Sequence, residues 1–119
     1  MYYHNTRETT VAKLSLTPEA LELIAERFKV LAEPARLQIL SCLRKHEATV
    51  SEIVDETGLG QANVSKHLQL LHTHGFVARR REGLYAHYVL ADAHVFKLCE
   101  LVCDSMNAAL SAKRLQLTS

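Results

Sequence analysis

The sequence of 119 residues lacks the features that mark several large classes of protein. It has no apolar run near the roughly 18 residues that a membrane-spanning helix needs. No apolar segment near its start resembles a secretory signal. It also has no glycine-rich phosphate-binding loop, no paired carboxylates in a pocket-like context and no nucleophile with a recognisable base. We therefore expect a cytoplasmic protein that is not an enzyme, has no membrane partner and carries no cofactor.

Cysteine is scarce and odd in number, since only Cys42, Cys99 and Cys103 are present. Without an export signal, such a set does not predict a disulfide framework. We expect reduced thiols at rest. Their simplest role is packing, because unpaired cysteine is among the most buried residue types and behaves as a small hydrophobe.

Acidic residues are absent from residues 57–81, although the chain has 13 of them in all. The same segment contains Lys66, Arg79, Arg80 and Arg81. A basic surface is therefore expected in a chain whose formal net charge is only +1. Such a local concentration of positive charge is typical of a surface that binds nucleic acid.

Length and a hydrophobic share of 48% predict one folded domain. Residues 1–14 show no periodicity and are expected to form a flexible N-terminal arm, with the domain at 15–113 and a tail at 114–119. Thr17 and Pro18 predict the start of the first helix, because a hydroxyl cap is followed by a proline suited to the first helical position. The apolar stripe of this helix comprises Leu21, Ile24, Phe28 and Leu31.

The middle of the chain predicts a helix-turn-helix motif. A helix at about 34–45 comes first, and Thr49 with Glu52 then fits a capping box that begins a short helix. The glycine-containing turn at 58–60 separates this helix from another at 61–74. Two short helices joined by such a turn are typical of the motif.

After Gly75 the pattern alternates, and residues 76–90 predict a β-hairpin whose tip is formed by the three arginines. Asp92 can cap a last helix, whose wide apolar stripe predicts a dimer interface. That stripe comprises Val95, Leu98, Cys99, Val102, Cys103, Met106 and Leu110. The expected fold is mainly α with a small β-hairpin: a winged helix-turn-helix of five helices and a two-stranded wing.

In this fold the second helix of the motif enters the major groove of DNA, and the hairpin reaches a neighbouring phosphate or the minor groove. Asn and Gln can read adenine through paired hydrogen bonds, whereas basic and hydroxyl side chains can hold phosphates. The expected contacts to duplex DNA are Gln61, Asn63, Ser65, Lys66, His67, Arg79, Arg80, Arg81 and Tyr85. A protein-docking module is the alternative with the same fold, and the carboxylate-free basic segment favours DNA.

Several segments resemble the ArsR/SmtB family of bacterial transcriptional repressors, with similarity from about Leu21 to Leu110. The segments that carry the resemblance run from Phe28 to Leu40, from Val64 to Leu71, from Gly75 to Val77 and from Arg80 to Gly83. The resemblance implies a homodimer built from the first and last helices. It also implies a double-stranded operator that is released when an effector acts.

The metal-binding motifs of that family are present only in part. Thiol sensors of arsenic, lead or cadmium carry a Cys-x-Cys motif where residues 48–51 read Ala-Thr-Val-Ser. Zinc and nickel members use an Asp-x-His pair, matched by Asp92 and His94, and a later His-x-x-Glu pair, replaced here by Ser105 and Ala108. Two ligands of four do not close a zinc site. We therefore predict no metal site, and the alternative ligand set is Asp92, His94 and Cys103.

A third branch of the family senses oxidants or reactive sulfur through cysteines on the second and last helices. Cys42 and Cys103 occupy those elements, and Cys99 lies one turn before Cys103. Ser41 rules out a switch between adjacent cysteines on the second helix. We predict a thiol switch formed by the three cysteines, with a packing role and metal ligation as the alternatives.

Overall fold

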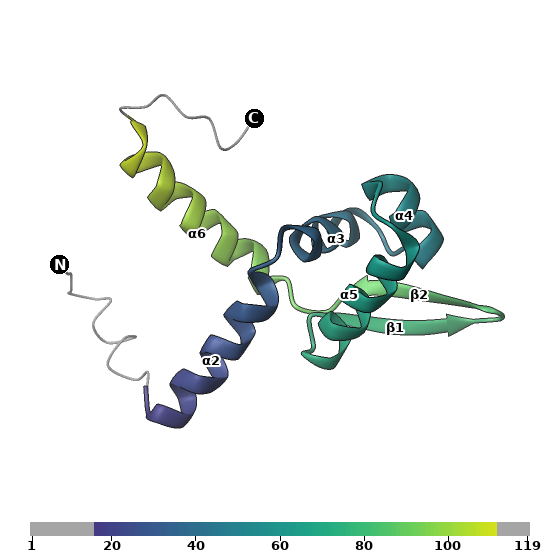
Figure 1. Ribbon diagram of the computed structural model, residues 1–119, viewed down its shortest axis with the longest axis horizontal. Helices are drawn as coiled ribbons and strands as arrows, with labels where there is room; N and C mark the ends of the chain where they lie inside the picture. Colours follow the sequence, from purple (N-terminus) through teal and green to yellow (C-terminus); the bar gives the residue numbers. More distant parts are fainter. Residues whose placement is uncertain (1–15, 112–119) are drawn as a thin grey trace.

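The computed structural model describes residues 16–111, which form five helices and one antiparallel hairpin (Figure 1). The elements are α2 (Pro18–Leu31), α3 (Pro34–Lys45), α4 (Val50–Thr57), α5 (Gln61–Thr73), β1 (Val77–Glu82), β2 (Tyr85–Leu90) and α6 (His94–Ala109). Their order confirms the predicted fold. The predicted arm at 1–14 and tail at 114–119 lie outside the described residues.

Local capping marks the start of α2 and both ends of α4. The Thr17 hydroxyl accepts a hydrogen bond from the Ala20 N–H at 3.1 Å and begins α2. At α4 the predicted capping box is confirmed, because the Glu52 N–H donates to the Thr49 hydroxyl at 3.2 Å and the Thr49 N–H donates to the Glu52 carboxylate at 2.8 Å. Gly58 ends α4 with a φ of 78°, a conformation that glycine adopts without steric cost.

The hairpin register places Arg80 opposite His87 and Glu82 opposite Tyr85. The chain reverses at Gly83, whose φ is 63°. The prediction that the three arginines form the tip is therefore wrong: they lie within β1, where successive side chains point to opposite faces. The physical reason is that a two-residue hairpin loop needs positive φ, which glycine supplies and arginine does not.

A pair of backbone hydrogen bonds attaches the α3–α4 loop to the hairpin. The Ala48 N–H donates to the Tyr88 carbonyl at 3.1 Å, and the Tyr88 N–H donates to the Ala48 carbonyl at 2.8 Å. Ala48 has no exposed surface. The helix-turn-helix and the hairpin are therefore joined through backbone hydrogen bonds as well as through side-chain packing.

The hydrophobic core lies between α3, α4, α5 and the hairpin. From α5 it receives Val64, Leu68 and Leu71, none of which is exposed, as their helical spacing predicts. Burial of one such side chain contributes about 1.5–3 kcal/mol, so this inner face sets the rotation of α5 about its axis. Other fully buried members are Ile39, Leu40 and Ile53.

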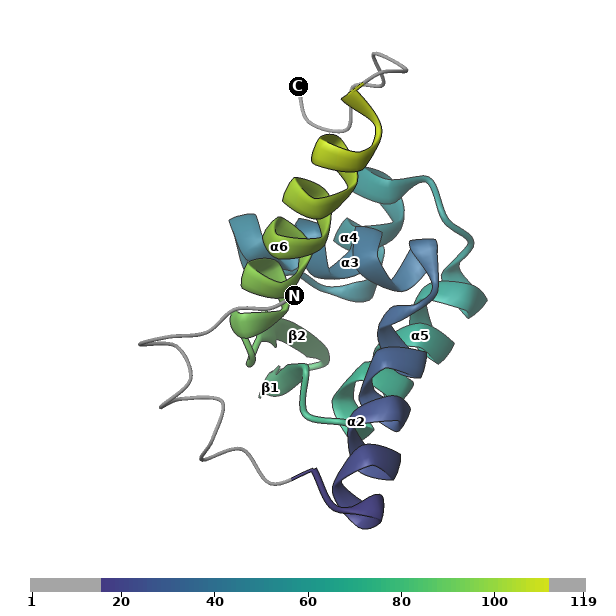
Figure 2. The ribbon, with the colours of Figure 1, turned by 90° about the vertical axis from the view of Figure 1, so that its left-hand side faces the viewer.

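Helices α2 and α6 extend away from this core and diverge from one another (Figure 1, Figure 2). Much of their apolar surface is uncovered in the single chain, with large side chains between 36% and 70% exposed. These side chains are Leu21, Leu23, Ile24, Phe28, Leu101, Val102 and Met106. Within the described part of the chain, no helix is long and apolar enough to cross a membrane.

Candidate nucleic-acid interface

The outward face of α5 is polar and carries no carboxylate. Gln61, Asn63, Ser65 and Lys66 are exposed there. Because the opposite face is anchored in the core, these four predicted DNA-contacting side chains project from a helix of fixed orientation. The face offers amide, hydroxyl and ammonium groups, which suit base edges and phosphates.

The fifth predicted contact on α5, His67, is only half exposed and forms a hydrogen bond with another residue of the protein, Arg36. Its Nδ1 lies 3.2 Å from a guanidinium nitrogen of Arg36, and the same guanidinium donates to the backbone carbonyl of Val30. Burial, and then the charge of Arg36, lower the pKa of His67 below its usual value of 6.5. His67 thus fastens α5 to the end of α2, a role that sequence analysis missed because residues 36 and 67 lie far apart in the chain.

A second arginine, Arg27 on α2, fastens the far end of α5. It donates to the His74 carbonyl at 2.9 Å and to the Asp92 carboxylate at 2.9 Å. Its guanidinium also lies 4.1 Å from the centre of the Phe76 ring, a cation–π distance. Arg27 therefore links α2, the end of α5 and the segment before α6, and no local sequence signal marks it.

The arginines of β1 differ in what surrounds them. Arg80 donates to Glu47 at 2.7 Å and to Glu82 at 3.1 Å. The hydrogen bond from Arg80 lowers the pKa of Glu47. By contrast, Arg79 and Arg81 are exposed and form no hydrogen bond or ion pair with other residues of the described range 16–111. Their charges are therefore the more accessible to a phosphate.

Tyr85 begins β2 beside the hairpin turn, and it is 66% exposed. Its neighbour Leu84 in the turn is 91% exposed. The wing therefore presents an aromatic ring and an apolar side chain at its end, with the arginines farther back along β1. Tyr85 remains a predicted contact, and Leu84 is not among the predicted contacts because the turn was expected to be basic.

The cysteines fall into two separate places. Cys42 is 3% exposed and lies where α3 contacts α4. Cys99 and Cys103 are half-buried on α6 and line an open apolar groove of about 520 Å³, together with residues of α2 such as Phe28. Burial raises the pKa of the Cys42 thiol to about 11.

The sequence predicted Asp92 as the cap of the last helix, but Asp92 lies one residue before the observed cap residue. Helix α6 begins at His94 with Ala93 as its cap residue, although the Asp92 carboxylate still accepts from the His94 N–H at 3.0 Å. The His94 ring also contacts that carboxylate at 3.0 Å. Cys103 lies nine residues further along α6, about 13 Å along the helix axis, so the three alternative ligands do not converge within one chain.

A helix-turn-helix with a buried inner face, followed directly by an antiparallel hairpin, defines a winged helix-turn-helix domain. Residues 33–79 match the profile of the family described as bacterial regulatory protein, arsR family. The chain belongs to the ArsR/SmtB family of transcriptional regulators, which confirms the resemblance drawn from the sequence.

Three similar proteins illustrate this relationship. The transcriptional repressor SmtB homolog of Synechocystis sp. is 34% identical over 94 residues, which span 75% of this chain and 71% of that protein. The crystal structure of Mycobacterium tuberculosis Rv0081 has a TM-score of 0.71 at 33% identity and covers 84% of this chain and 100% of that one. The solution structure of the homodimeric winged helix-turn-helix DNA-binding domain Mb0332 of Mycobacterium bovis has a TM-score of 0.63 at 29% identity and covers 100% of both chains.

Proposed function

We propose that the chain is a homodimeric, sequence-specific DNA-binding repressor that releases its operator in response to a small signal. The observation that carries the proposal is the outward face of α5, where Gln61, Asn63 and Lys66 are exposed and no carboxylate occurs. An α-helix fits the major groove, and the amide side chains suit adenine edges. The exposed Arg79 and Arg81 supply phosphate contacts from the wing.

Helices α2 and α6 supply the dimer interface in this proposal. Their uncovered apolar side chains would cost free energy in water, and a second copy of the chain offers a matching surface. The related Mb0332 domain is a homodimer. A two-fold dimer presents two recognition helices to half-sites about 34–36 Å apart, one turn of DNA.

The test is the affinity for duplex DNA from upstream of the protein's own gene, measured by fluorescence anisotropy against a scrambled duplex. We expect Asn63→Ala to lose preference for the operator, because a bidentate base contact is worth about 1–3 kcal/mol. Lys66→Gln should weaken both duplexes alike. Lys97→Gln is the matched control, since Lys97 is an exposed lysine on α6. Equal affinity for both duplexes at all salt concentrations would contradict the proposal and favour a docking module.

The signal in this proposal acts on the thiols of α6. Cys99 and Cys103 lie one turn apart beside the apolar groove between α2 and α6. Hydrogen peroxide would oxidise a thiolate there to a sulfenic acid: the oxygen–oxygen bond breaks, sulfur loses two electrons and hydroxide leaves. This change places a polar group in the apolar surface that pairs the two copies. The protonated, buried Cys42 is the less reactive thiol.

A gel shift tests the signal. Reduced protein should retain the operator, peroxide- or polysulfide-treated protein should release it, and a reductant should restore binding. The Cys99→Ser/Cys103→Ser protein should bind with or without oxidant, whereas Cys42→Ser should respond as the wild type does. Release from the double variant on oxidation would remove the α6 thiols from the mechanism.

A further inference from the structure

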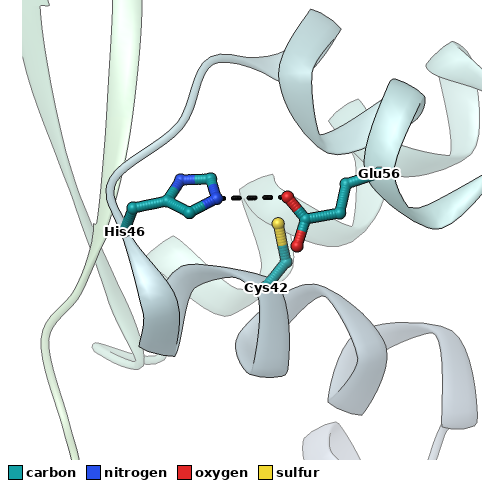
Figure 3. A group of neighbouring side chains, drawn as sticks. All are labelled: Cys42, His46 and Glu56. Carbon is teal, nitrogen blue, oxygen red and sulfur yellow. Dashed lines mark hydrogen bonds and ion pairs between the residues drawn. The ribbon is translucent and has the colours of Figure 1, made fainter.

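Three side chains that can bind a metal ion meet between α3 and α4 (Figure 3). They do not line the groove that contains Cys99 and Cys103. They are Cys42, His46 and Glu56, and one ligand atom from each lies within 4.8 Å of the other two. Within residues 16–111 no other group of three such side chains is this close. Cys42 lies in the last turn of α3, His46 is the residue that follows the helix, and packing of α4 brings Glu56 to them.

The His46 ring is already oriented as in a metal ligand. Its Nδ1 lies 2.9 Å from the Glu47 carbonyl, and its Nε2 lies 3.1 Å from the Glu56 carboxylate. Metal-binding histidines characteristically donate one ring N–H to a carbonyl and turn the other nitrogen toward the ion. His46 thus aims Nε2 at the space that Cys42 and Glu56 border.

We propose that Cys42, His46 and Glu56 form a binding site for a divalent transition-metal ion of the zinc class. Thiolate, imidazole and carboxylate are the three ligand types that Zn²⁺ takes, at bond lengths of about 2.0–2.3 Å. Those bond lengths place ligand atoms roughly 3.5 Å apart in a tetrahedron, so small side-chain rotations suffice. The proposal concerns metal binding by the chain itself and does not depend on DNA binding.

The surroundings leave room for the fourth ligand that a tetrahedral ion needs. A cavity of about 160 Å³, bordered by Gln38, Ser41 and Lys45, adjoins the group and has room for a water molecule as a fourth ligand. Lys45 contacts the second carboxylate oxygen of Glu56 at 3.2 Å, which leaves the oxygen facing His46 for the ion. The ion would take the place of the thiol proton and of the proton between His46 and Glu56. It would also tie α4, the first helix of the helix-turn-helix, to α3.

The test is titration of reduced, chelator-treated full-length protein with Co²⁺, which reports thiolate ligation through its sulfur-to-metal charge-transfer band. We expect one Co²⁺ per chain with that band, its displacement by Zn²⁺, and a rise in Tm on metal addition. Cys42→Ser should lose the band. His46→Gln and Glu56→Gln, at partly exposed positions, should weaken Co²⁺ binding by at least about 10-fold.

Two matched controls locate the site. Cys99→Ser/Cys103→Ser removes the other thiols, and His94→Gln alters a second histidine–carboxylate pair, the one with Asp92. Both should bind Co²⁺ as the wild type does, and circular dichroism should show every variant folded. Loss of the band in either control, retention of the band in Cys42→Ser, unchanged affinity in both His46→Gln and Glu56→Gln, or absence of binding to the wild type would overturn the proposal.

Discussion

The guanidinium of Arg36 bridges the Nδ1 atom of His67, at 3.2 Å, and the carbonyl at the end of α2. One side chain therefore connects a helix assigned to the dimer interface with the helix assigned to the major groove. Hydrogen bonds that involve a charged group contribute about 1.5–3 kcal/mol each, so this connection is energetically significant.

Replacing Arg36 should loosen α5. We expect Arg36→Ala to lower the free energy of unfolding by about 1.5–3 kcal/mol. Arg36→Lys should recover only part of this, because an ammonium group cannot hold both acceptors in the planar geometry of the guanidinium. Urea denaturation measures both. Arg81→Ala, an exposed arginine, is the control and should change stability by no more than about 0.5 kcal/mol. Equal effects at positions 36 and 81 would contradict the bridging role.

Acidification should destabilise the protein through His67. Burial, followed by the charge of Arg36, places the pKa of folded His67 below the usual 6.5, while Glu33 opposes and Lys66 adds to this shift. The unfolded chain therefore binds the proton first, and stability falls as the pH drops below about 6.5 toward the folded pKa.

The measurement is Tm for wild type and His67→Gln between about pH 7.5 and pH 5, the interval that spans this titration. The wild type should lose more stability than the variant on acidification. His46, whose pKa is raised chiefly by its bond to the Glu47 carbonyl, contributes the opposite trend in both proteins and cancels in the difference. Parallel curves for the two proteins would disprove a lowered pKa at His67.

The arginines of the wing should not be equivalent in DNA binding. Arg81→Ala should weaken binding to all duplexes and reduce the slope of log K against log salt by about 1, because one phosphate contact is lost. Arg80→Ala should do less, since Glu47 and Glu82 already compensate its charge. Glu47→Gln should strengthen binding by freeing Arg80. Identical salt slopes for the Arg80 and Arg81 variants would show that both reach phosphates.

A charge placed on the apolar face of α6 should separate the proposed dimer. Val102 is 49% exposed in the single chain and lines the groove beside α2. Val102→Glu would bury an unpaired carboxylate on association, and we expect dimer affinity to fall at least about 10-fold. Sedimentation velocity gives the oligomeric state. Lys97→Glu introduces the same group at an exposed position of the helix, and its dimer should persist.

Local chemistry made most of the fold predictable. The capping box at Thr49, the glycine at position 58 and the spacing of Val64, Leu68 and Leu71 each act over a few residues, and each was confirmed. The predicted hairpin tip is wrong because a run of arginines does not by itself specify a turn, whereas Gly83 carries the local signal for the reversal.

The contacts that organise the candidate sites were not predictable in the same way. Arg27 with Asp92, Arg36 with His67 and Glu56 with the Cys42–His46 pair join residues distant in the chain. Such pairs come together only through the packing of whole helices, so no periodicity in the sequence predicts them. The four-residue spacing of Cys42 and His46 is the one sign of their group in the sequence, and two possible ligands at this spacing do not specify a third.

The two hydrogen bonds between Ala48 and Tyr88 also affect how an operator could be released. Because they join the loop before α4 to β2, the helix-turn-helix and the wing cannot move apart at this point without breaking backbone hydrogen bonds. In the proposed dimer, a signal received at α2 and α6 then acts by changing the distance and tilt between the two DNA-binding units, each made of a helix-turn-helix and its wing. In this view, repression is lost when the spacing of the two α5 helices no longer matches the helical repeat of DNA, while the structure within each DNA-binding unit is unchanged.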